Sequence, residues 1–274
     1  MPAPTEKMPA VSLVKLKKQI ESLVWLYTQP AEFADALRGI LEQYADHTYR
    51  PSAANPESSR SIGAYHVPPI VIRQIELALN HLISENPSPA IKLANHLWRE
   101  NKEEPRLLAI FIAGTIPASA SDSVITLIKQ WAEEETDQIL LERLFSEGTI
   151  TLRRFAIQNW LNTIEEWLAD SSERVQKRGL MAILPLIKDR QFENIPIVFN
   201  LCTPIFYNYP KAHGYELTSL LIALAERTPA ELVFYIRQLV GSSNSPDLHR
   251  LIRRCLPAFP KEIQERIRPM LKRE

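Results

Sequence analysis

The chain contains 21 prolines but only 7 glycines, and this imbalance limits the folds open to it. β-Hairpins, turn-dense barrels and glycine-rich phosphate loops need residues that tolerate positive φ, and glycine is the main one. Proline instead suits the first turn of a helix, where its missing N–H costs nothing. Prolines precede or open many of the apolar stretches that have helical periodicity: Pro30, Pro68, Pro89, Pro105, Pro229, Pro246 and Pro260. The composition therefore predicts a helical fold in which prolines mark the starts of helices.

Apolar residues recur at helical spacing almost throughout the chain. Residues 12–27 carry one such stripe, and Pro30 opens a second predicted helix that ends at Tyr44. Residues 46–67 lose this periodicity and collect Ser, Pro and Asn, so we expect a long loop there. From Pro68 onward no alternation typical of strands occurs, and helices are expected to begin near residues 68, 88, 103, 120, 136, 149, 162, 173, 192, 212, 229, 246 and 260. We expect an N-terminal helical pair at 1–45, the loop at 46–67 and an array at 68–274, all within one continuous domain.

The predicted helices form pairs that resemble one another. Residues 124–145, 163–184 and 231–256 each read as an apolar helix, a short polar turn and a second helix carrying arginine among aliphatic residues. First helices recur at a ragged spacing of roughly 30–42 residues, which is typical of helical-hairpin arrays. The sequence therefore predicts an all-α protein, an α-solenoid of HEAT-like hairpin repeats.

The charge of the chain is balanced in total but segregated along the sequence. It has 32 basic and 32 acidic side chains, whereas residues 98–147 carry 5 basic and 10 acidic ones and residues 229–274 carry 9 basic and 5 acidic ones. A neutral total excludes binding of nucleic acid by bulk charge, but it allows a basic face. The second helices of hairpin arrays commonly line the concave side. We therefore expect the basic residues of these helices to form a row that binds phosphates. They are Arg143, Lys177, Arg178, His249, Arg250, Arg253 and Arg254, with Arg153 and Arg154 as further candidates.

Several other site types find no support in the sequence. Cys202 and Cys255 both lie in apolar runs, as buried thiols of a reducing compartment do. No spacing of His, Asp and Glu suggests a metal site, and we expect neither metal nor cofactor. No apolar run is long enough for a membrane span and the start lacks a hydrophobic signal core, so we expect a cytoplasmic protein without membrane contact.

Four segments of the chain carry a resemblance to a known family: SIGAYHVPPIVIRQIELAL (61–79), LWRENKEEPRLLAIFIAG (97–114), EEWLADSSERVQKRGLMAI (165–183) and LAERTPAELVFYIRQL (224–239). They resemble the HEAT-like DNA alkylation repair enzymes, a family of alkylpurine DNA glycosylases. The resemblance covers about residues 61–260 and implies the HEAT-like fold. It also implies cleavage of the N-glycosidic bond of N3- or N7-alkylated purines in duplex DNA, with no metal or organic cofactor.

The family's site residues fall on this chain only in part. The resemblance places the catalytic aspartate on Asp137 and the arginine that holds a phosphate beside the lesion on Arg178. Glu133 and Ser219 stand where the family has two tryptophans, and Trp131 is the nearest indole to the first of these positions. A carboxylate with aromatic faces nearby would stabilise the positive charge that develops on the sugar during base release.

Each assignment has a structural alternative. Asp137 is also placed to cap the helix that follows it, and Trp131 lies in an apolar stripe typical of core residues. Three functions are therefore open: an alkylpurine glycosylase, a related DNA-structure-binding protein that lacks the chemistry, and a scaffold for protein partners. We expect a monomer whose partner is duplex DNA, alkylated or distorted.

Overall fold

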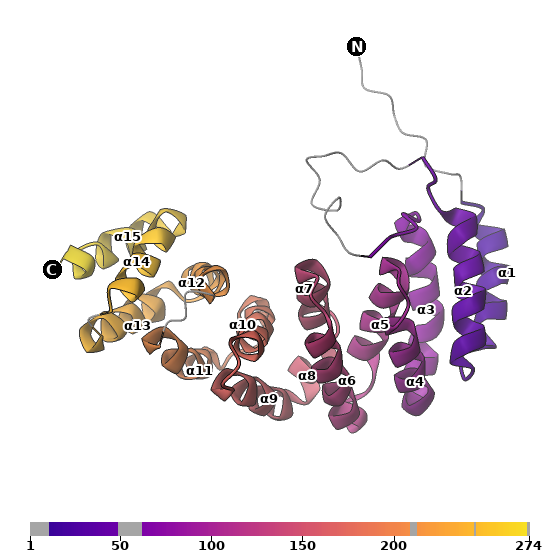
Figure 1. Cartoon of the computed structure of the whole chain (residues 1–274), viewed down its shortest axis with the longest axis horizontal. Coiled ribbons are helices and arrows are strands. Elements are labelled where there is room, and N and C mark those ends of the chain that lie inside the picture. The colour runs from indigo at the N-terminus through magenta and orange to yellow at the C-terminus, as the bar shows by residue number, and fades with distance from the viewer. Residues whose placement is uncertain (1–10, 49–61, 209–212, 244, 273–274) are drawn as a thin grey trace, which may run out of the picture. The chain divides into compact units, whose positions relative to one another are not determined.

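The computed structural model describes residues 11–48, 62–208, 213–243 and 245–272. These residues form helices and no strand; an isolated bridge joins Gly63 to Lys102. The chain divides into two compact units, Met1–Phe155 and Ala156–Glu274, which we describe separately (Figure 1). Residues 49–61 of the predicted loop lie outside the described residues.

The first unit consists of two layers of helices. Its helices are α1 (Leu13–Val24), α2 (Pro30–Tyr44), α3 (Pro69–Glu85), α4 (Pro87–Trp98), α5 (Glu103–Thr115), the 3-10 turn η2 (Ala118–Ala120), α6 (Ser121–Glu134), α7 (Gln138–Ser146) and α8 (Ile150–Phe155). Helices α1, α3, α5 and α7 pack in sequence as one layer, and α2, α4 and α6 form the other. The N-terminal pair α1–α2 thereby packs on the next hairpin, α3–α4.

The second unit repeats this arrangement. Its helices are α9 (Ile157–Ala169), α10 (Glu173–Lys188), α11 (Ile195–Tyr207), α12 (Gly214–Arg227), α13 (Pro229–Ser242), α14 (Pro246–Cys255), η4 (Leu256–Ala258), α15 (Lys261–Ile267) and η5 (Met270–Lys272). Helices α9, α11, α13 and α15 pack as one layer, and α10, α12 and α14 as the other. The predicted class, all-α with HEAT-like helical hairpins, is confirmed.

Proline begins helices as the sequence predicts. It occupies the first position of α2, α3, α4, α13 and α14. Pro185 lies inside α10, where it cannot donate the helical N–H bond. One predicted start is wrong, because α9 begins at Ile157 and not near residue 162.

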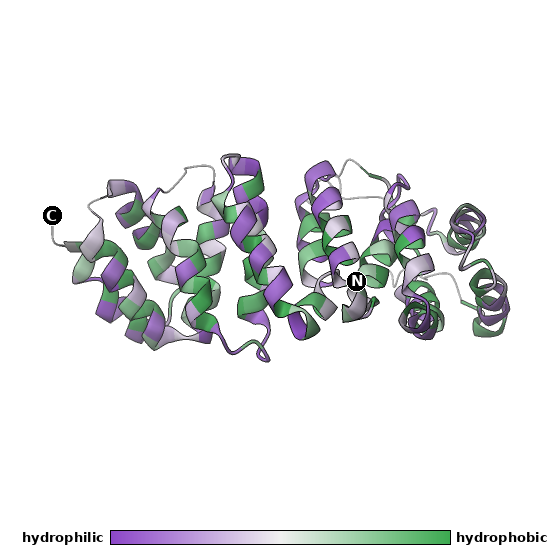
Figure 2. Cartoon of the chain, turned by 90° about the horizontal axis from the view of Figure 1, so that it is seen from below, coloured by the Kyte–Doolittle hydropathy of each residue, from purple (hydrophilic) through white to green (hydrophobic). Residues whose placement is uncertain are grey.

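The helices bury apolar side chains between them, and hydrophobic and hydrophilic positions alternate along their ribbons (Figure 2). Some large apolar side chains stay exposed, among them Val14, Phe155 and Phe234. Close approach between neighbours requires a glycine at one point of the first unit. A Cβ atom added to Gly114 of α5 would lie 2.1 Å from the carbonyl oxygen of Glu147, in the turn that follows α7. No single helix among the described residues is long and apolar enough to cross a membrane; the sharply bent pair Glu103–Thr115 and Ala118–Glu134 reaches that length and composition together.

The segment that leads into α3 is fixed by a buried carboxylate. Glu104 of α5 accepts the backbone N–H of Tyr65 at 2.8 Å and that of His66 at 2.7 Å. His66 has φ of 55°, a conformation that residues other than glycine rarely adopt. The carbonyl of Tyr65 accepts the N–H of Asp46 at 3.1 Å, so both ends of the 46–67 region meet beside α5.

Candidate functional site

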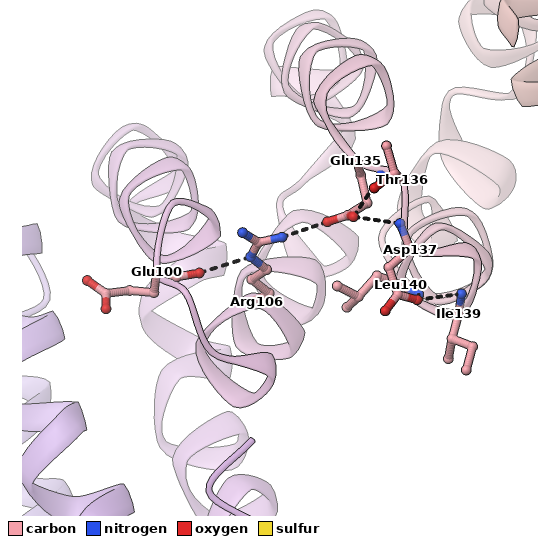
Figure 3. Close-up of polar contacts among 7 residues, drawn as sticks. All are labelled: Glu100, Arg106, Glu135, Thr136, Asp137, Ile139 and Leu140. Carbon is pink, nitrogen blue, oxygen red and sulfur yellow. Dashed lines mark hydrogen bonds and ion pairs between the residues drawn. The ribbon is translucent and has the colours of Figure 1, made fainter. Parts of the chain in front are cut away.

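Asp137, the predicted catalytic aspartate, is the N-cap residue of α7. Its Oδ1 atom accepts the backbone N–H of Ile139 at 2.8 Å and that of Leu140 at 3.2 Å (Figure 3). A carboxylate at this position satisfies backbone donors of the first turn and interacts favourably with the helix dipole. Among the described residues the structure shows no donor that bonds to Oδ2, and the side chain is half-buried. Asp137 therefore has a structural role in addition to the catalytic one that we predict.

Glu135 shapes the turn that carries Asp137. Its Oε1 atom accepts the N–H of Thr136 and that of Asp137, each at 2.7 Å. Its Oε2 atom forms an ion pair with Nη1 of Arg106 at 2.6 Å (Figure 3). Both carboxylate oxygens of this buried side chain are thus occupied.

Arg106 links the turn to the start of α5. Its Nε atom donates to the carbonyl of Glu100 at 2.9 Å. Its guanidinium carbon lies 5.5 Å from the ring centroid of Trp98, a cation–π distance. The guanidinium is therefore held by an ion pair, a backbone carbonyl and an aromatic face.

Trp131 is a core residue, which corrects its assignment as an aromatic wall. It is fully buried and stacks on Trp98, with ring centroids 4.7 Å apart and planes 10° from parallel. Its Nε1 atom donates to Oδ1 of Asn95 at 3.3 Å. No face of the indole is open to a bound base, because α4 and α6 pack against each other at this point.

The predicted basic residues at the end of the first unit differ in exposure. Arg143 is exposed and pairs with Glu147, with 2.8 Å between Nε and Oε1. Arg153 donates to the carbonyls of Phe145 at 2.9 Å and Ser146 at 3.0 Å, so it ties α8 to the end of α7. Arg154 is exposed. Arg143 and Arg154 therefore remain candidates for phosphate contacts, whereas Arg153 serves the fold.

Arg178 and His249 do not lie on an open face, which corrects their place in the predicted row. Each is only 7% exposed. Arg178 lies in α10 where this helix packs on α9 and α12, and its Nη1 is 3.8 Å from the sulfur of Met181. His249 lies on the buried side of α14, between the core residues Leu248 and Leu251. The period of the helix turns both side chains inward, although Lys177, directly before Arg178, is one-third exposed and Arg250, directly after His249, is exposed.

Lys177, Arg250, Arg253 and Arg254 are the predicted residues that reach the surface of the second unit. Arg250 is exposed and pairs with Asp247 at 2.9 Å. Arg253 donates to the carbonyl of Leu271 at 2.7 Å. Arg254 donates to the carbonyl of Gly214 at 2.8 Å and to Oγ1 of Thr218 at 3.0 Å.

Two of these basic residues meet at the start of α12. Nζ of Lys177 lies 3.1 Å from Oε1 of Glu216, a buried carboxylate in the first turn of α12. Arg254 contacts the same turn through Gly214, and Tyr215 between these contact points is 65% exposed. Lys177, Arg250, Arg254 and Tyr215 form what we call the α12 patch. Tyr215 and Glu216 were not predicted from the sequence as site residues. Only the packing of α10 and α14 on α12 brings the basic side chains beside them.

His213, directly before α12, is buried below this patch. Its Nε2 atom lies 3.1 Å from Oε1 of Gln176. Burial lowers the pKa of the imidazole, and the nearby carboxylate of Glu216 opposes this shift. No group of three or more His, Cys, Asp or Glu side chains in the described part of the chain could hold a metal ion.

The fold and these contacts define a HEAT-like helical-hairpin protein, and comparison with known families places it further. Residues 65–210, more than half of the chain, match the family model of the DNA alkylation repair enzymes. The chain belongs to this family. The match runs from the segment held by Glu104 to the end of α11, and so includes Asp137 and α10.

Comparisons with solved structures and with curated sequences show less similarity. The crystal structure of YibA from Escherichia coli aligns with 82% of this chain and 100% of its own, at 13% identity and a TM-score of 0.29. A search of curated protein sequences finds no match.

Proposed function

We propose that this chain is a DNA-binding member of its family that contacts the phosphate backbone through the α12 patch. The observation that carries the proposal is the meeting of Lys177 and Arg254 at the first turn of α12, where α10 and α14 pack on this helix. Arg250 and Arg254 are one helical turn apart and share a face of α14. Cations grouped in this way hold phosphates and release counterions on binding.

One ion pair of the α12 patch can exchange its acidic partner for a phosphate. The pair between Arg250 and Asp247 is exposed, and such pairs contribute less than about 1 kcal/mol. A phosphate group can therefore replace Asp247 at small cost. Tyr215 adds an exposed ring beside these cations, and an aromatic ring in such a place can stack on an unpaired base.

The salt dependence of duplex binding tests this proposal. The double variant Arg250→Gln/Arg254→Gln should weaken binding and reduce the slope of log K against log salt by about 2, about one for each phosphate contact removed. The matched control is Arg237→Gln/Lys261→Gln, which removes two exposed cations from α13 and α15, in the other layer of the same unit. Fluorescence anisotropy of a labelled duplex gives both slopes.

Equal slopes for the two double variants would contradict the assignment of the α12 patch. Absence of duplex binding at low salt would contradict DNA binding altogether and would favour the protein-scaffold function. Circular dichroism of both variants controls for folding, since Arg254 also bonds to α12.

A second candidate function is excision of N3- or N7-alkylated purines, and the geometry of Asp137 favours it. One oxygen of its carboxylate is fixed by the helix cap, while Oδ2 has no hydrogen bond to a described residue. Alkylation at these ring positions makes the base cationic and hence a good leaving group. A fixed carboxylate would then stabilise the positive charge that develops on the sugar and position a water molecule.

Release of 7-methylguanine from methylated duplex DNA tests the excision proposal. Asp137→Asn is the informative variant, because asparagine caps a helix about as well as aspartate but carries no charge. We expect its single-turnover rate to fall by about 100-fold or more, with DNA affinity unchanged. An unchanged rate would remove Asp137 from the chemistry. Binding without any base release by the wild-type chain would favour the DNA-structure-binding alternative.

A further inference from the structure

The turn between α6 and α7 is folded around the side chain of its own first residue. It comprises Glu135, Thr136 and Asp137, and the carboxylate of Glu135 accepts the two backbone N–H groups that follow it. Asp137 has extended backbone angles, φ of −68° and ψ of 114°. These angles bring its Oδ1 atom to the N–H groups of Ile139 and Leu140. The position of the Asp137 carboxylate thus depends on a backbone that Glu135 holds.

Glu135 depends in turn on Arg106. A buried carboxylate is stable only when it is paired and its oxygens are hydrogen-bonded. Arg106 supplies the charge at 2.6 Å, and is itself fixed by the Glu100 carbonyl and the Trp98 ring. Because Arg106 belongs to α5, the support crosses from one helix to the turn between the next two (Figure 3).

We infer that Arg106 and Glu135 are positioning residues for Asp137. They set the direction in which Oδ2 points and contact no substrate themselves. The catalytic part of this inference rests on the proposed excision by Asp137. Its structural part, that Arg106 controls the cap of α7 through Glu135, is independent of any activity.

Amide hydrogen exchange tests the structural part. Arg106→Met removes a side chain that bonds to none of the four amides concerned, those of Thr136, Asp137, Ile139 and Leu140. We expect exchange at all four to accelerate by at least about tenfold, because both the turn and the cap loosen. Glu135→Gln should give the same pattern if Arg106→Met does not fold. Wild-type protection at Ile139 and Leu140 in the folded variant would overturn the inference.

The matched control is Glu134→Gln. Glu134 is the neighbouring residue, is exposed and bonds only on its own helix, to Nε2 of Gln130 among the contacts that the structure shows. We expect exchange at the four amides to stay at the wild-type rate in this variant. Acceleration equal to that of Glu135→Gln would mean that charge alone, and not the ion pair with Arg106, governs the turn, and would overturn the inference.

A double-mutant cycle tests the catalytic part. Glu135→Gln should lower the single-turnover rate of 7-methylguanine release by about tenfold or more and leave the DNA dissociation constant unchanged. In the Asp137→Asn background the same substitution should lower the rate no further, because its effect passes through the lost carboxylate. Additive losses would show that Glu135 acts independently of Asp137 and would overturn the assignment.

The two proposals fail in distinguishable ways. If the wild-type chain releases no base, the excision proposal fails, while the amide exchange still decides whether Arg106 and Glu135 position Asp137. If base release is normal and the cycle is additive, excision stands and the positioning role fails.

Discussion

Each unit contains a buried glutamate paired with a cation, and the two pairs are built differently. In the first unit Glu135 is 5% exposed and its partner Arg106 is 17% exposed. In the second unit Glu216 is 3% exposed and its partner Lys177 is 33% exposed. Glu135 uses Oε1 for two backbone N–H groups and Oε2 for the guanidinium, whereas Oε2 of Glu216 is buried without a hydrogen bond to a described residue.

The difference follows from the cations and from what surrounds them. A guanidinium is a planar fork that can hold a carboxylate, a carbonyl and an aromatic face together, while an ammonium is a strongly hydrated point charge. Arg106 therefore serves as a fixed part of the fold. Lys177 is one-third exposed, and under the proposed DNA binding it would exchange Glu216 for a phosphate. The first unit thus has a cation that is part of its fold, and the second has one that is partly open to solvent.

Removing Arg106 should have the largest effect. Arg106→Met leaves the carboxylate of Glu135 buried without its counter-charge, and breaking such a pair costs about 3 kcal/mol or more. We expect this loss in the free energy of unfolding of the first unit, measured by denaturant titration with local amide exchange. The double variant Arg106→Met/Glu135→Gln should recover part of it, since no buried charge remains. A loss below about 1 kcal/mol would mean that water reaches Glu135.

Removing Lys177 should cost less. Lys177→Met removes a partner that is one-third exposed, so we expect a loss of about 1–2 kcal/mol, confined to the second unit. Lys177→Met/Glu216→Gln should be as stable as the wild type or more so, because Glu216 then carries no uncompensated charge. Amide exchange in α10 and α12 measures both effects. A loss equal to that of Arg106→Met would show that the two pairs are energetically equivalent.

Sequence periodicity predicted the helices well because they bury apolar side chains at helical spacing and several begin at a proline. Pro30 and Tyr44 bound α2 as predicted, and Pro229 and Pro246 begin α13 and α14. The site was predicted less well. Exposure of a basic residue depends on which face its helix presents to its neighbours, and Arg178 turns inward while Lys177 beside it turns outward.

Long-range pairs had no local signal in the sequence. Arg106 and Glu135 are 29 residues apart, one in α5 and the other in the turn that follows α6, so only packing brings them together. Asp137 was predicted both as a catalytic residue and as a helix cap; the structure shows the cap, and the catalytic role stays a prediction.

Removing the helix cap at Asp137 should lower the stability of the first unit by a moderate amount. Asp137→Ala loses the bonds to the amides of Ile139 and Leu140 and should cost about 1 kcal/mol of stability. Asp137→Asn should cost only a few tenths of a kcal/mol, because its side-chain oxygen still caps α7. Thermal unfolding of both variants checks this difference. Equal losses would mean that the charge of Asp137, and not its hydrogen bonds, stabilises α7.

Acidification should have the smallest effect and should appear in the second unit, at His213. Burial lowers the pKa of this imidazole in the folded state below that of the unfolded chain, about 6.5. Above pH 6.5 the imidazole is neutral in both the folded and the unfolded chain, and its contribution to the free energy of unfolding is complete. As the pH falls below 6.5, the unfolded chain binds the proton first. The free energy of unfolding therefore decreases until the pH reaches the lower pKa of the folded state. The effect is small because Glu216 and Glu173 attract the protonated ring and oppose burial. Amide exchange in α12, corrected for intrinsic rates, should show weaker protection at pH 5.5 than at pH 7.5, and His213→Gln should remove this difference. A difference that persists in His213→Gln would place the titrating group elsewhere in the unit.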